Sequence, residues 1–82
     1  SRNWTCPSKG KYRIVFSAEC EIGTDVYIML DDNITLYRSE KTNRVQHENI
    51  VRLEDDTLIQ FVCGRGYLKK ISIDIQKTPD NR

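Results

Sequence analysis

Residues 69–76 read Lys-Lys-Ile-Ser-Ile-Asp-Ile-Gln, and this alternation of apolar and polar side chains decides the fold class of the chain. Isoleucine occupies every second position from 71 to 75, and the positions around them are polar. Because successive side chains of a β-strand point to opposite faces, the pattern predicts a strand with one face in a core and the other in water.

Five earlier segments are also predicted to be strands, because each has strand-like patterning and is bounded by turn-forming residues. They are residues 11–18, 25–31, 34–39, 44–53 and 57–63. Turns are expected between them at 21–24, 31–33, 40–43 and 54–56, and at 64–66 before the last strand. Strands at a spacing of roughly 8–12 residues predict a small all-β fold, an antiparallel sandwich or barrel with almost no helix.

Length and charge limit the organisation and the class of partner. The 82 residues predict a single domain, 1–82, with an ordered core at about 10–77 and flexible termini at 1–9 and 77–82. Thirteen basic against twelve acidic residues give a net charge of +1, which argues against a dedicated DNA-binding protein. No apolar run approaches the roughly 20 residues that span a bilayer, so no membrane partner is expected.

Three cysteines, Cys6, Cys20 and Cys63, have the spacing of neither a metal site nor a CxxC redox pair. In a small β-rich chain they indicate one disulfide and one remaining thiol, and hence an oxidising compartment and a secreted protein. Two tripeptides that begin at Asn3 and Asn33 fit the N-glycosylation pattern and agree with secretion.

Strand direction ranks the possible disulfides. If successive strands reverse direction, Cys20 at the end of the first strand and Cys63 at the end of the fifth lie at the same pole of the domain. Cys6, which precedes the first strand, begins at the opposite pole. We therefore expect the pair Cys20–Cys63, and Cys6–Cys63 stays open because Cys6 precedes a flexible segment.

Catalytic chemistry has little support in the sequence. The single histidine, His47, lies in a predicted strand without a motif that would orient it against a nucleophile. The acidic pairs Asp31-Asp32 and Asp55-Asp56 fall in turns and lack the spacing of a calcium loop. We expect no enzyme activity, no catalytic residue, no cofactor and no metal.

Binding is the remaining class of function. Tyr27, Met29 and Tyr37 fall on the face or edge that the alternation leaves outside the core, and such side chains are enriched in recognition surfaces. Arg65 and Tyr67 form a small basic and aromatic group that could stack on single-stranded nucleic acid, although the near-neutral charge makes this the weaker alternative.

The predicted sandwich also has edge strands, and residues 34–39 and 44–53 are the expected edges. An edge strand can accept a strand of a partner protein through its free backbone groups. An extracellular ligand- or inhibitor-type module is a second alternative. We expect a monomer in either case.

The strand pattern, the few cysteines and the inferred secretion resemble those of the MAX effectors, small secreted avirulence proteins and toxins of plant-pathogenic fungi. The resemblance is carried by residues 11–20, 25–30, 34–39 and 57–75. It implies a six-stranded antiparallel β-sandwich of two three-stranded sheets with one disulfide, and no enzymatic activity. It also implies a virulence function, the binding of host proteins, with translocation into a host cell as an open alternative. The family's usual bridge would favour Cys6–Cys63.

Overall fold

The structure is a computed structural model that describes residues 2–79, and it is all-β and antiparallel as predicted. Its five strands are β1 (Arg2–Thr5), β2 (Gly10–Leu30), β3 (Ile34–Leu53), β4 (Leu58–Arg65) and β5 (Leu68–Lys77). No helix in the described range is long and apolar enough to cross a membrane.

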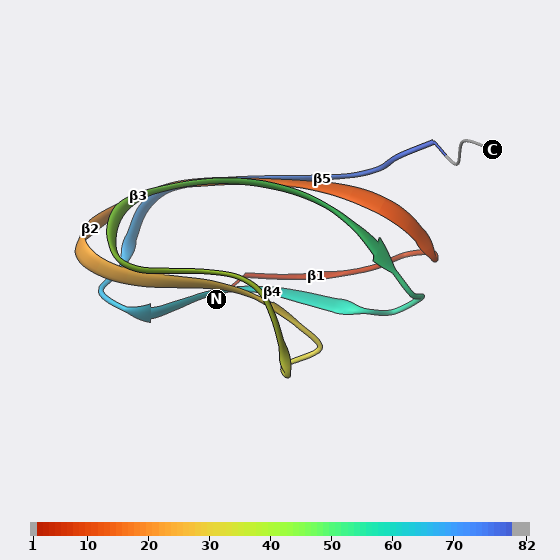
Figure 1. The fold of residues 1–82 in the computed structure, drawn as a ribbon, viewed down its shortest axis with the longest axis horizontal. Coiled ribbons are helices and arrows are strands. Elements are labelled where there is room, and N and C mark those ends of the chain that lie inside the picture. Colours follow the sequence, from red (N-terminus) through yellow and green to blue (C-terminus); the bar gives the residue numbers. More distant parts are fainter. Residues whose placement is uncertain (1, 80–82) are drawn as a thin grey trace.

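Strand β2 organises the sheet (Figure 1). It pairs with β3 along most of its length, with β5 through residues 12–20 and with β4 through residues 25–30, and β4 in turn pairs with β1. The sheet therefore folds back on itself. The β5 layer comprises β5, the first half of β2 and the second half of β3. The β4 layer comprises β1, β4, the second half of β2 and the first half of β3.

The separation of residues 11–18 from 25–31, and of 34–39 from 44–53, is wrong, because each pair forms one strand. The segments 21–24 and 40–43 bend the chain without reversing it. Register shifts between Glu19 and Val26, together with positive φ at Gly23 (90°) and Lys41 (54°), make the bend. Both strands bend at the same level, so their pairing continues on either side.

Strand β1 lies in the first nine residues, where we expected no strand. Its Trp4 packs edge-on against Tyr12, with ring centroids 5.3 Å apart. Cys6 beyond it is fully buried, and its N–H donates to the carbonyl of Thr57 at 2.8 Å. At the other end, β5 stops at Lys77. Of the expected frayed tail at 77–82, residues 80–82 lie outside the described range.

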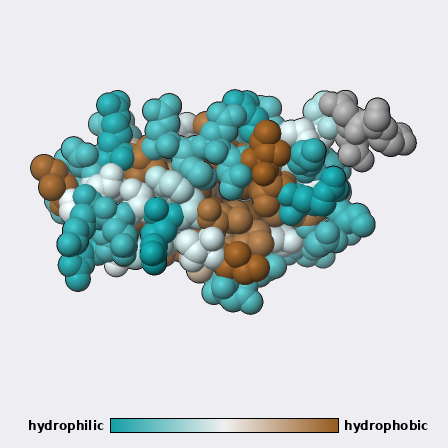
Figure 2. Space-filling view, in the orientation of Figure 1, coloured by the Kyte–Doolittle hydropathy of each residue, from teal (hydrophilic) through white to brown (hydrophobic). Residues whose placement is uncertain are grey.

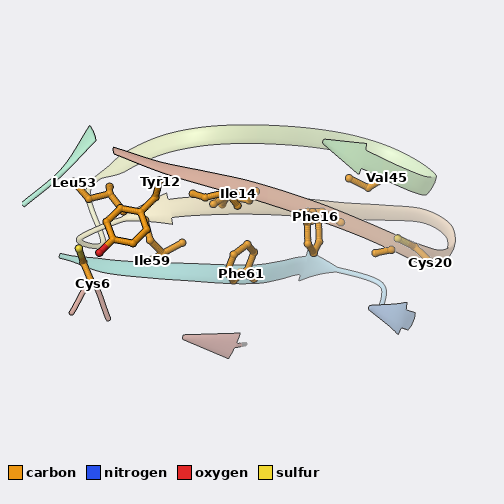
Figure 3. Packing of buried hydrophobic residues seen from close by; sticks show 12 residues of the cluster. Cys6, Tyr12, Ile14, Phe16, Cys20, Val45, Leu53, Ile59 and Phe61 are labelled. Atoms are coloured by element: carbon orange, nitrogen blue, oxygen red, sulfur yellow. The ribbon is translucent and has the colours of Figure 1, made fainter. Parts of the chain in front are cut away.

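The core lies between the two layers (Figure 3). Phe16 from the β5 layer and Phe61 from the β4 layer meet at its centre, with ring centroids 5.4 Å apart. Phe16 has no exposed surface, and burying a side chain of this size contributes about 2–3 kcal/mol. The buried apolar residues are Cys6, Tyr12, Ile14, Phe16, Ala18, Cys20, Val26, Ile28, Val45, Leu53, Ile59 and Phe61.

Candidate protein-interaction surface

Strand β3 is a free edge over its whole length. It pairs with β2 only, so its outer side faces no other described strand. Two of its backbone N–H groups instead donate to side chains near the bend, Lys41 to Asp25 Oδ1 at 2.9 Å and Arg44 to Thr42 Oγ1 at 3.3 Å. The two expected edges, 34–39 and 44–53, are therefore confirmed as edges, joined in one strand.

Exposed apolar side chains accompany this edge. Ile34 is 52% exposed and Ile50 is 56% exposed, one in each half of β3. The space-filling view shows a hydrophobic band that crosses the middle of the molecule between hydrophilic flanks (Figure 2). Exposed isoleucines beside unpaired backbone groups form a surface that a partner can cover.

Two of the predicted binding residues, Tyr27 and Met29, lie on the outer face of the β4 layer. Their neighbours Val26 and Ile28 are buried, so alternation points Tyr27 and Met29 outward. The Tyr27 ring lies across Gly64, where an added Cβ would be 2.6 Å from Tyr27 Cε2. Both side chains are half-buried, so much of each packs on its own sheet.

Tyr37 lies on the edge strand β3, as predicted, but its side chain does not point outward as alternation predicts. Tyr37 is half-buried, packs against the core and stacks on His47, with ring centroids 4.0 Å apart and an interplanar angle of 21°. The register explains the error, because Ile28 pairs with Tyr37 but Met29 pairs with Thr35. Leu36 is thus an extra residue in β3, and it reverses the alternation on which the prediction rests.

His47 lies on the same half-buried stack, where its ring packs against Tyr37. Its Nε2 is buried without a hydrogen-bond partner among the described residues. Burial lowers the pKa of His47 below its usual value of 6.5, because a buried imidazolium loses its hydration. The ring is therefore neutral near pH 7, and it joins the two halves of β3 by stacking.

Arg65 and Tyr67 lie at the turn between β4 and β5, which docks on the bend of β2. Arg65 is exposed and pairs in register with Asp25. Tyr67 is 56% exposed, its carbonyl accepts from the Glu21 N–H at 3.1 Å, and the Glu21 carboxylate raises the pKa of its hydroxyl. Of the four residues, the β4 layer contains Tyr27, Met29 and Arg65. Tyr67 lies just beyond β4, in the turn that leads to β5.

The expected Cys20–Cys63 disulfide is absent, and all three cysteines are free thiols. Cys20 is buried on the inner face of β2, whereas the Cys63 thiol is directed along its own hairpin, 3.3 Å from the Gly66 carbonyl oxygen. Burial, and then the nearby Cys63, raise the pKa of Cys20. Cys6 lies at the opposite end of the core from Cys20 (Figure 3), as strand direction predicts.

The acidic pairs Asp31-Asp32 and Asp55-Asp56 lie in turns, where one carboxylate of each pair accepts a backbone hydrogen bond. The Asp31 carboxylate accepts from the Leu58 N–H at 2.9 Å, and Asp55 accepts from the Lys9 N–H. No group of three metal-binding side chains occurs within residues 2–79.

A cavity of about 630 Å³ lies between β1, β4 and β5. Its lining residues are Arg2, Asn3, Trp4, Phe61, Ile73, Asp74 and Ile75. This lining is partly apolar and brings together no nucleophile and base.

The sequence pattern predicts the two edge segments of β3 and the outward-facing Tyr27 and Met29 of β2, but it misses the exposed Ile34 and Ile50. Alternation marks an isoleucine in a strand as a core residue, so it carries no signal that these two are exposed. No family model matches the chain, and comparisons with curated proteins and with solved structures find no match.

Proposed function

We propose that this protein is a secreted, non-enzymatic interaction module, a virulence effector that binds host proteins by strand addition. The host-binding surface comprises the first half of β3, Ile34–Ser39, and the adjoining outer-face residues Tyr27 and Met29. The observation that carries the proposal is the free outer edge of β3, which leaves backbone donors and acceptors available beside an exposed isoleucine.

The side chains around this edge suit a partner strand. The Ile34 side chain is available for burial beneath such a strand. Thr35 pairs in register with Met29 and Arg38 with Tyr27, so these two β3 residues continue the outer face toward the partner. A strand added here would form backbone hydrogen bonds with β3, and its outward side chains would lie beside Thr35 and Arg38.

We further propose that the fold is a six-stranded sandwich of the MAX-effector type. Support comes from counting each half of the bent β2 and β3 as a strand. The β5 layer then has three strands, and the β4 layer has three plus the short β1. A MAX-type sandwich without a catalytic cleft would act through binding alone.

The test is capture of a partner from host-plant extract by the wild type and two matched variants. Ile34→Lys places a charge at the proposed surface, and Ile22→Lys places the same charge at an 85% exposed isoleucine in the bend of β2. We expect the first variant to lose the partner and the second to keep it, with unchanged circular dichroism for both. Equal binding by both variants, or equal loss, would contradict the proposal.

An enzymatic function has its own test. We expect no hydrolysis of RNA, glycan or peptide by the purified protein. An activity that disappears in His47→Ala while the fold is retained would overturn the assignment as a non-enzymatic module.

A further inference from the structure

The second half of β3, residues 44–53, is one of the two edges of the β5 layer, the other being β5, and is separate from the host-binding surface. Its centre is the sequence Glu48-Asn49-Ile50-Val51-Arg52. Glu48, Ile50 and Arg52 are exposed, and the neighbouring strand positions are half-buried or buried. An acidic residue thus lies two positions before an exposed isoleucine, and a basic residue lies two positions after it, all on one face.

The basic end of this sequence lacks an acidic partner. The register of β2 and β3 sets Lys11 directly opposite Arg52, and like charges at such a cross-strand position are destabilising. Glu48 already pairs with Arg13, whose Nε lies 2.6 Å from Glu48 Oε2. No ion pair of Arg52 occurs among residues 2–79, so an acidic group beside Arg52 would relieve the repulsion.

We propose that this edge pairs with the same edge of a second copy of the chain, antiparallel, about a two-fold axis at Ile50. Ile50 of one copy then lies against Ile50 of the other. Glu48 of each copy lies against Arg52 of the other, so this contact occurs twice, because a two-fold interface repeats every pair. The arrangement covers an isoleucine that is 56% exposed and gives Arg52 its acidic partner.

Neighbouring registers fit less well. An axis at Glu48 sets the two Glu48 carboxylates against each other and Arg44 against Arg52. An axis at Val51 sets Glu48 against Glu54. An axis at Asn49 would set Ile50 against Glu48. Only the axis at Ile50 pairs opposite charges and buries apolar surface against apolar surface.

The interface is small, because it consists of one strand from each copy. Interfaces below about 1,200 Å² are characteristic of weak, transient complexes. The dimer should therefore dissociate on dilution, and it replaces the expected monomer only at high concentration.

The test is sedimentation equilibrium of the purified full chain over a range of concentrations. We expect the wild type to dimerise reversibly. Glu48→Arg and Arg52→Glu should each weaken dimerisation by about tenfold or more, because each sets two like-charged pairs across the axis. The double variant Glu48→Arg/Arg52→Glu should recover much of the dimerisation that each single variant loses, since opposite charges again meet across the axis, even though position 48 no longer pairs with Arg13.

A mixture of the two single variants gives a second measurement. One copy then carries two arginines at positions 48 and 52 and the other carries two glutamates, so we expect a heterodimer where neither variant forms a homodimer. Lys70→Glu, on the exposed face of β5, is the control and should change nothing. A wild type that stays monomeric at the highest concentration, or a double variant no better than the singles, would overturn the proposal. Because Ile34 is unchanged in these variants, host binding is tested separately.

Discussion

Two glycines permit a matched test of the architecture: Gly23 in the bend of β2, and Gly66 in the β4–β5 turn that contacts this bend. Gly23 (φ 90°) and Gly66 (φ 79°) both have the left-handed backbone conformation that disfavours other residues. Replacement by alanine at either position should therefore cost about 1–2 kcal/mol for the backbone alone. A Cβ at Gly23 would meet no atom within 4 Å, so Gly23→Ala measures this backbone contribution.

Gly66→Ala adds a steric contribution. Its Cβ would overlap Thr24 Oγ1 and lie 3.1 Å from Thr24 Cα. Thr24 is fully buried, and its hydroxyl donates to the Glu21 carbonyl at 2.5 Å, which holds the bend. Displacing that hydroxyl should cost a further 1–3 kcal/mol or so, and the total of about 2–5 kcal/mol is a large part of the stability of a small domain.

The assay is urea unfolding followed by the fluorescence of Trp4, the single tryptophan, which packs against Tyr12. The free energy of unfolding should fall more for Gly66→Ala than for Gly23→Ala. In a Thr24→Ala background, the cost of Gly66→Ala should shrink, because the overlapping hydroxyl is gone. If the two glycine variants agree within roughly 0.5 kcal/mol, the β4–β5 turn does not dock on the bend as described.

Two further predictions concern titration and thiols. Burial lowers the pKa of His47, so the imidazole binds a proton more readily in the unfolded chain than in the folded one. The free energy of unfolding should therefore fall as the pH drops below about 6.5, and His47 should not affect it above that pH. His47→Phe keeps a ring against Tyr37 but cannot be protonated, so in urea unfolding its free energy of unfolding should fall less between pH 7.5 and pH 5 than that of the wild type. If the fall is the same in both proteins, groups other than His47 cause it. For the cysteines, we expect three thiols per denatured chain by reaction with a chromogenic disulfide reagent, and slow reaction of fully buried Cys6 in the native state. A mass two hydrogens lower than that of the reduced chain would show that a bridge forms.

Local signals in the sequence were sufficient for individual strands and tight turns. Residues 69–76 were predicted as a strand, and β5 is Leu68–Lys77. The turn predicted at 31–33 joins β2 to β3, with positive φ at Asp31 and Asp32. These features depend on alternation and turn chemistry within a few residues, which a single sequence displays directly.

Features that depend on pairing were not predictable in this way. A glycine at position 23 is compatible with a turn that reverses the chain or with a bend within one strand. Only the pairing with β3, which bends at the same level, decides between the two. The extra residue Leu36 reverses the orientation of Tyr37 for the same reason, since a bulge is defined by the partner strand. The thiols show the same limit: strand direction predicts that Cys20 and Cys63 lie at one end, whereas the Cys63 thiol contacts carbonyl oxygens of its own hairpin and the two cysteines are not bonded.

The continuity of β3 connects the two proposed surfaces. Because the strand bends instead of ending, its first half borders the β4 layer and its second half borders the β5 layer, so a host strand and a second copy would use different residues of one edge. The stack of Tyr37 on His47 holds the two halves in their relative positions. A variant that disrupts the bend, such as Gly66→Ala, should therefore weaken both interactions, whereas Ile34→Lys should weaken only host binding and Arg52→Glu only dimerisation. This pattern separates the loss of a shared scaffold from the loss of either contact.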